Sequence, residues 1–246
     1  MKHNDIQDKD MTDHYCAISQ NINPALVKYG LNPSKIDLVY SGFDPLRFAN
    51  GTTAQVADLR CELGFGDNDR VVLNAAHLSK EKGQDVLLRA LAIMRPKYPD
   101  LRLVFAGGGD ASVLQQLAVE LGIADKVVFA GFRHDVGVFY NLCDVFTLPS
   151  LNEGLGTSVL DAMALKKPVV FSNAGGLSEI VTDGVSGRVV PVGDAEGLAE
   201  ALAACFDNVT LNREMAEQGY ARLMANFTLD KMVAENLVVY EKFLKF

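Results

Sequence analysis

The residues with the clearest chemical potential lie in the segment 152–158, Asn-Glu-Gly-Leu-Gly-Thr-Ser. An apolar run ends at Leu148 shortly before it, and helical spacing begins at Thr157. Gly154 and Gly156 bring bare backbone to the start of that helix, where free N–H groups and the helix dipole attract a phosphate. The segment therefore predicts an anion site at a strand-to-helix turn.

Two acids accompany this turn. Glu153 stands just before it, and because like charges repel, it is predicted to accept hydrogen bonds from sugar hydroxyls rather than to bind the phosphate. Asp161 follows in the first turns of the helix and could reach a ribose diol. Spacing alone leaves an alternative open, in which Glu153 is a solvated loop acid and Asp161 a surface acid of the helix.

A second candidate site follows the apolar run 71–76. Lys82 precedes Gly83 at a predicted helix entrance, where an ammonium group would neutralise a diphosphate as a point charge. His77 follows the run directly and is a weaker candidate. The alternative is that Lys80 and Lys82 are solvated loop charges and that His77 is a packing or surface residue.

Glycines follow two further apolar runs. The triplet 107–109 lacks the spacing of a dinucleotide fingerprint, so no nicotinamide cofactor is inferred. Gly107 would still let a ligand approach the end of a strand closely. Gly131, Phe132 and Arg133, after the run 127–130, are placed to flank a base with backbone groups, and a structural turn is at least as good an interpretation.

All these loops follow predicted strands. Near-continuous apolar runs alternate with segments of helical spacing, which predicts a Rossmann-like α/β fold with a parallel sheet and helices on both faces. In such folds ligands bind at the carboxyl ends of the strands, near the switch in strand order. The strands are predicted at 71–76, 101–106, 127–130, 145–148, 168–171 and 188–190. The helices are predicted at 85–95, 110–121 with Asp110 as N-cap, 136–142, 157–165, 195–206, 211–226 and 229–246.

The first part of the chain departs from this repeat. Residues 1–13 are polar and are interpreted as a flexible lead-in. A strand at 14–18, a helix at 23–29 and a strand at 36–40 follow, so that 14–34 is predicted to be a remnant of another domain or a linker. The main α/β domain is predicted to span 35–228, followed by a last helix at 229–246.

Composition excludes several classes of protein. The 246 residues carry a formal net charge of −8, so the surface should repel nucleic acid and anionic membranes. No apolar run is long enough to span a bilayer. The cysteines are far apart, which argues against a zinc cluster and a disulfide framework and favours reduced thiols in a cytoplasmic protein.

Taken together, the segments resemble the C-terminal domain of the retaining glycosyltransferases with the two-domain GT-B fold, called family 4 or group 1. The resemblance begins at about Ser19, and its most specific part is the run from Glu153 to Ala164, which is similar to the family's E-x7-E signature. The other matching segments are 36–44, Lys82-Gly83, 105–109, 128–132, 144–150 and 175–181.

The resemblance implies transfer of a hexosyl group from a UDP- or GDP-linked sugar to a glycan or lipid-linked acceptor, without a metal or other cofactor. By matching position, Lys82 and Glu153 are the candidate catalytic residues. The implied donor-binding residues are His77, Lys82, Gly107, Gly131, Phe132, Glu153, Gly154, Leu155, Gly156, Thr157 and Asp161. A role in polysaccharide biosynthesis, in the cytoplasm or at the inner face of the membrane, is implied by resemblance only.

The sequence departs from the family pattern at several points. The usual Gly-Arg-Leu reads Ala76-His77-Leu78, so the second cation is a histidine that is only partly charged near neutral pH. Asp161 is one methylene shorter than the usual Glu, and the usual Asn-Gly reads Ser41-Gly42. The resemblance makes 35–228 the nucleotide-sugar-binding domain and implies that the helix 229–246 crosses back to the N-terminal half of a GT-B fold. That half is not matched. Weak or no activity without that half is therefore expected, together with exposed apolar surface near 15–29 and 229–246 and self-association that would cover it.

Two other functions compete with this interpretation. His77 is only partly charged and Asp161 is shorter than the usual Glu, so both weaken the predicted donor site. This favours a diverged, non-catalytic module that binds a partner protein or regulates it. A sugar-phosphate epimerase on a similar fold would need a second acid/base constellation, and the sequence offers none.

Overall fold

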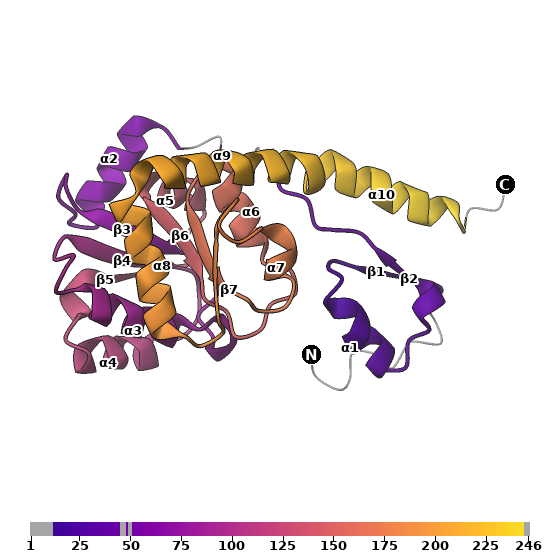
Figure 1. Ribbon diagram of the computed structural model, residues 1–246, viewed down its shortest axis with the longest axis horizontal. Coiled ribbons are helices and arrows are strands. Elements are labelled where there is room, and N and C mark those ends of the chain that lie inside the picture. The colour runs from indigo at the N-terminus through magenta and orange to yellow at the C-terminus, as the bar shows by residue number, and fades with distance from the viewer. Residues whose placement is uncertain (1–11, 45–47, 49–50, 244–246) are drawn as a thin grey trace.

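The computed structural model describes residues 12–44, 48 and 51–243. Its main body is built on a parallel six-stranded sheet with the strand order β5-β4-β3-β6-β7-β8 (Figure 1). The strands are β3 (Arg70–Asn74), β4 (Leu101–Ala106), β5 (Val127–Gly131), β6 (Val145–Leu148), β7 (Val169–Ser172) and β8 (Arg188–Val190). The central pair is β3 and β6, in which Val72 lies opposite Val145. The chain adds strands outward from β3 to β5 on one side and then outward from β6 to β8 on the other, so the strand order switches between β3 and β6.

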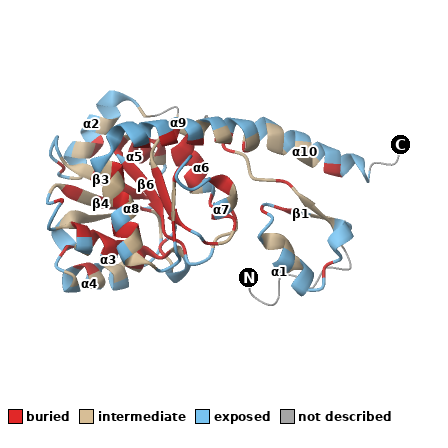
Figure 2. Ribbon diagram, viewed as in Figure 1, coloured by how far each residue is buried: buried red, intermediate tan, exposed pale blue. Residues whose placement is uncertain are grey.

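Helices cover both faces of this sheet because alternate strand residues point to opposite sides. Val71 and Leu73 of β3 belong to one core cluster and Val72 to the other. The first cluster packs against α2 (Thr53–Glu62), α5 (Val136–Leu142), α6 (Thr157–Ala164), α7 (Leu177–Ile180) and α9 (Val209–Asn226). The second packs against α3 (Gln84–Met94), α4 (Ser112–Glu120) and α8 (Ala195–Asp207). In Figure 2 the buried residues lie on the sheet and on the parts of the helices that cover it. The parallel sheet with helices on both faces confirms the predicted fold class.

The sequence did not predict α2. Its start carries a reciprocal capping box, in which the side chain of Thr52 accepts from the Gln55 N–H and Gln55 accepts from the Thr52 N–H. The helix buries only Leu59, so it shows no apolar stripe for a periodicity argument to find. Asp110 was also assigned wrongly as an N-cap. The N-cap of α4 is Ala111, and the Asp110 carboxylate accepts from the N–H of Ser112, the first residue of the helix.

The first described residues form a small lobe set apart from the main sheet. It consists of β1 (Tyr15–Ala17), α1 (Ile22–Lys28) and β2 (Ile36–Leu38), with β1 and β2 paired in parallel. The helix α10 (Leu229–Glu241) continues from α9 and extends away from the main body toward this lobe (Figure 1). Asp37 of β2 binds His14 at 2.7 Å and Lys242 at 2.5 Å, which ties the end of α10 to the lobe.

The lobe and α10 expose apolar side chains, as the sequence led us to expect for 15–29 and 229–246. Residues 244–246 lie outside the described residues. The exposed side chains are Ile18, Val27, Tyr29, Leu229, Val233, Leu237, Val238, Tyr240 and Phe243. Of the helices within the described residues, none combines the length and the apolar character that crossing a bilayer requires.

One carboxylate joins the lobe to the main body. Glu179 of α7 accepts from the N–H groups of Gln20 and Asn21, at 2.8 and 2.9 Å, and so occupies the amino end of α1. It also accepts from the Tyr40 hydroxyl at 2.8 Å. Burial, together with this contact to Glu179, raises the pKa of Tyr40 to about 12.

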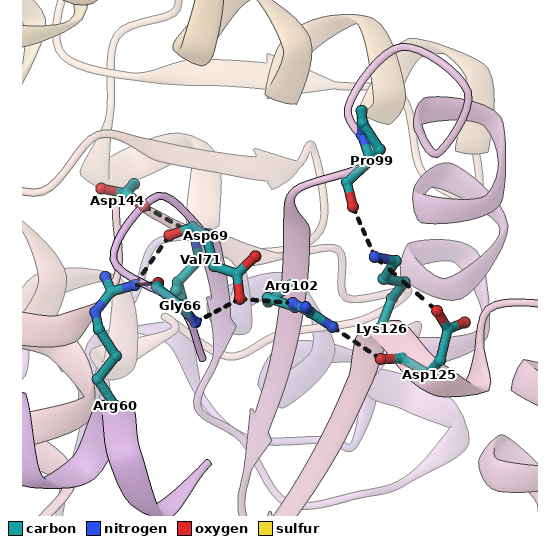
Figure 3. A network of polar contacts seen from close by, with 9 residues as sticks. All are labelled: Arg60, Gly66, Asp69, Val71, Pro99, Arg102, Asp125, Lys126 and Asp144. Atoms are coloured by element: carbon teal, nitrogen blue, oxygen red, sulfur yellow. Dashed lines mark hydrogen bonds and ion pairs between the residues drawn. The ribbon is translucent and has the colours of Figure 1, made fainter. Parts of the chain in front are cut away.

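Hydrogen bonds and ion pairs connect the amino-terminal ends of the strands (Figure 3). The guanidinium of Arg102 donates to the Asp69 carboxylate at 2.9 Å, and Asp144 accepts from the Val71 N–H at 2.8 Å. Burial alone would raise the pKa of Asp69, but the Gly66 N–H and Arg102 together lower it below its usual range. These contacts stabilise the edge opposite the carboxyl ends of the strands.

Candidate functional site

The loops that follow β3 and β6 meet where the strand order reverses. Leu151 of the second loop donates its N–H to the Glu81 carbonyl of the first at 2.7 Å. Between the same two loops, Nζ of Lys82 donates to Oε2 of Glu153 at 2.5 Å. The two residues that the sequence singled out most strongly thus lie side by side at the switch point, where a doubly wound sheet binds ligands.

Gly83 allows this close approach. It has a φ of +63°, and a Cβ added to it would lie 2.0 Å from the Pro149 carbonyl oxygen. A side chain at this position would meet backbone strain and a hard contact together.

We therefore expect Gly83→Ala to lower the free energy of unfolding by about 3 to 4 kcal/mol, since left-handed strain and overpacking add. Gly64→Ala is the matched control, because Gly64 has a φ of +70° with open space around it and should lose only about 1 to 2 kcal/mol. Urea unfolding of both variants measures the difference. Equal losses would show that the contact with Pro149 does not constrain the loops.

The Lys82–Glu153 pair is sheltered and further supported. The side chains are 25% and 12% exposed, respectively. The Ser150 hydroxyl donates to the same Glu153 oxygen at 3.2 Å. Cγ of Glu153 lies 3.4 Å from the Cβ position at Gly156, so the carboxylate is adjacent to the amino end of α6. A cation and an acid are therefore fixed beside a helix start.

The amino end of α6 is open to an anion. Gly156, its N-cap, has a left-handed φ of 87°, no side chain caps the helix, and its first turn holds no acid. Within the described residues, no hydrogen-bond acceptor is present for the N–H groups of Thr157 and Ser158. Unpaired amides and the positive end of the helix dipole attract a phosphate here.

A cavity of about 360 Å³ opens beside this helix end. It brings together five of the predicted donor-binding residues, which are His77, Gly107, Phe132, Thr157 and Asp161. Asp161 is only 4% exposed, and Phe132 is 71% exposed at the rim. The remaining lining residues are Ala75, Ala76, Ala106, Gly108, Arg133, Val136, Tyr140 and Ser158.

The other predicted residues lie outside this lining. They are Lys82, Gly131, Glu153, Gly154, Leu155 and Gly156. Leu155 is 1% exposed and belongs to the hydrophobic core, so only its backbone could touch a ligand. Gly154 packs near Ile18 and Ile22 of the lobe. Lys82 is placed by its contact with Glu153, and Glu153 by its position against Gly156 at the start of α6.

Two further lining residues carry polar groups whose contacts the sequence did not reveal. Arg133 pairs with Asp135 at 2.8 Å and with Glu62 of α2 at 2.7 Å, and these carboxylates raise its pKa above the usual range. Tyr140 is buried and donates its hydroxyl to the Ser158 carbonyl at 3.1 Å. The sequence placed Arg133 beside Phe132 but gave no sign of its pair with Glu62, which depends on the unpredicted helix α2. Tyr140 was missed because its pattern is that of a core residue of α5.

Comparison with known proteins agrees with this arrangement. The profile described as "Glycosyl transferases group 1" matches residues 56–222. A D-inositol 3-phosphate glycosyltransferase of Salinispora tropica is 33% identical over 228 residues, which cover 87% of this chain and 47% of the relative. The crystal structure of Anabaena HepE in complex with UDP-glucose superposes with a TM-score of 0.85 at 28% identity, over 93% of this chain and 64% of that chain.

A third similarity concerns the fold alone. The C-terminal domain of a group 1 family protein (LpcC) from Francisella tularensis matches over its whole length and over 76% of this chain, with a TM-score of 0.66 at 24% identity. The chain spans about half the length of the curated relatives that it matches. Because the profile covers more than half of the chain, and its boundaries contain Lys82, Glu153 and Asp161, the chain belongs to the group 1 family of glycosyl transferases.

Proposed function

We propose that this chain is the donor-binding half of a retaining glycosyltransferase, which holds a nucleoside diphosphate sugar for hexosyl transfer. The observation that carries the proposal is the Lys82–Glu153 pair beside the uncapped amino end of α6. The pair lies where the loops that follow β3 and β6 meet. A cavity of about 360 Å³ next to it is within the range that small-molecule sites occupy.

Each part of the donor has a partner in this proposal. Lys82 and the N–H groups of Gly156 and Thr157 hold the diphosphate, so that protein groups supply the positive charge and no metal is needed. Glu153 accepts hydrogen bonds from the sugar hydroxyls, and Asp161 accepts from the ribose. His77, Gly107, Gly131 and Phe132 surround the remaining part of the nucleotide.

Two comparisons support this assignment. HepE, at 28% identity, was crystallised with UDP-glucose, and a nucleotide sugar of this type is the donor that we propose here. The sequence resemblance to the retaining family supports retention of the anomeric configuration. We propose a glycan or a lipid-linked sugar as the acceptor.

The exposed apolar side chains of the lobe and α10 support the presence of a second domain in the enzyme. Val233, Leu237 and Tyr240 are 48%, 55% and 63% exposed along one helix. Exposed patches of this kind mark interaction sites. We propose that the other half of a GT-B fold covers them and supplies the acceptor contacts, because transfer requires a closed cleft between donor and acceptor.

Donor binding can be tested on the chain as it stands. UDP-glucose or GDP-mannose at a hundred times its dissociation constant should raise the free energy of unfolding by about 2.7 kcal/mol, since only the folded state binds it. Thermal shift and titration calorimetry measure the effect. A protein that gives no shift and no binding heat with either nucleotide sugar would not have the proposed function.

A further inference from the structure

Lys82 and Glu153 are assigned to different parts of the donor, yet they bind each other. Nζ of Lys82 donates to Oε2 of Glu153 at 2.5 Å, and both side chains are largely sheltered from solvent. A ligand that takes Lys82 for its diphosphate must therefore compete with a carboxylate. Such competition is stronger in a sheltered site than in water, because the effective dielectric constant is lower.

Glu153 also brings negative charge close to the proposed phosphate site. Its Cγ lies against Gly156, the residue that begins α6. A diphosphate bound at this helix end would face both the attraction of the amides and the repulsion of the carboxylate. Glu153 therefore weakens the hold on a bare diphosphate.

A sugar on the diphosphate changes this balance in two ways. It esterifies the terminal phosphate, which lowers the negative charge that faces Glu153. Its hydroxyl groups also donate to the carboxylate, and hydrogen bonds to a charged acceptor are stronger than those between neutral groups. The same side chain then attracts the ligand that it otherwise repels.

We propose that Glu153 makes the site discriminate between a nucleoside diphosphate that carries a sugar and one that does not, through its pair with Lys82 and its position at the start of α6. This inference rests on the proposed function. It gives Glu153 a role in specificity beyond holding the sugar, because it favours release of the nucleoside diphosphate that remains after transfer.

The test compares UDP with UDP-glucose in titration calorimetry on the wild-type chain and on Glu153→Gln, which keeps the shape of the side chain and removes its charge. We expect the variant to bind UDP about three to ten times more tightly, since Lys82 is released and the repulsion is gone. The affinity of the variant for UDP-glucose should be unchanged or lower than that of the wild-type chain. The ratio of the two dissociation constants, UDP over UDP-glucose, should fall about threefold or more.

Glu81→Gln is the matched control. Glu81 is an exposed acid in the same loop as Lys82, and within the described residues its side chain has no ion pair. This substitution changes the net charge by the same amount as Glu153→Gln does. It should leave the ratio of the two dissociation constants within about twofold of the wild-type value, because exposed charges are screened. Glu153→Ala serves as a second variant if Glu153→Gln does not fold, with the same direction expected for UDP.

Two results would overturn the inference while leaving the proposed function intact. One is a variant that binds UDP more weakly than the wild-type chain does. The other is an unchanged ratio in Glu153→Gln, as in the Glu81 control. Binding of neither nucleotide to the wild-type chain is a different outcome, which refutes the proposed function and this inference with it.

Discussion

Replacing Lys82 by methionine is expected to weaken the binding of UDP-glucose by about ten- to a hundredfold, because the diphosphate loses a charge-assisted hydrogen bond in a sheltered site. The variant also leaves Glu153 without its cation, 12% exposed and next to the incoming phosphates, which adds repulsion. Titration calorimetry at fixed ionic strength measures the loss.

Lys80→Met is the control for this variant. Lys80 lies in the same loop but is exposed, so its removal changes the long-range charge without removing a contact to the proposed phosphate site. Its effect on affinity should be about twofold or less and should disappear at high salt. Equal losses in the two variants would mean that Lys82 acts only as one of several solvated charges.

Asp161→Asn is expected to remove most of the preference for UDP over 2′-deoxy-UDP. Asp161 is 4% exposed and lines the cavity from the second turn of α6, where a carboxylate could accept from a ribose hydroxyl. A hydrogen bond to a charged group is worth about 1.5 to 3 kcal/mol, so the wild-type chain should prefer UDP by about ten- to a hundredfold. In the variant the two dissociation constants should approach each other.

Binding of 2′-deoxy-UDP is the internal control for a folding defect in this variant. A general loss of folding would weaken both ligands alike, whereas loss of a ribose contact weakens UDP alone. If Asp161→Asn lowers stability and keeps the full preference for UDP, Asp161 is a structural acid of α6. The sequence alternative of a surface acid does not agree with its burial.

The strands were predictable because each is an apolar run bounded by turn residues. β4, β6 and β8 begin and end at the predicted residues, and the remaining strands of the main sheet deviate by only a few positions. The helices that bury an apolar stripe, such as α3 and α5, were equally clear. In contrast, α2 buries only Leu59 and α7 is a single turn, so periodicity could not identify them.

The site was predictable where its residues follow strands directly. The carboxyl ends of parallel strands lie at one edge of a sheet, and this rule predicts that Lys82 and Glu153 lie near each other. The direct pairing of the two side chains could not be predicted, because it depends on Gly83 bringing one loop against the Pro149 carbonyl of the other. The ion pair of Arg133 with Glu62 also depends on a tertiary contact, because the two residues are 71 positions apart, whereas its pair with Asp135 is local.

The central claim is that a diphosphate binds at the start of α6, between the loops that carry Lys82 and Glu153. Titration of ¹⁵N-labelled protein with UDP-glucose, followed by amide shifts, tests it most directly. The account predicts the largest shifts at Gly156, Thr157 and Lys82, with little change at Val209 and Arg213, which line a separate cavity between α8 and α9. Shifts that cluster around that second cavity, with Gly156 and Thr157 unmoved, would contradict it.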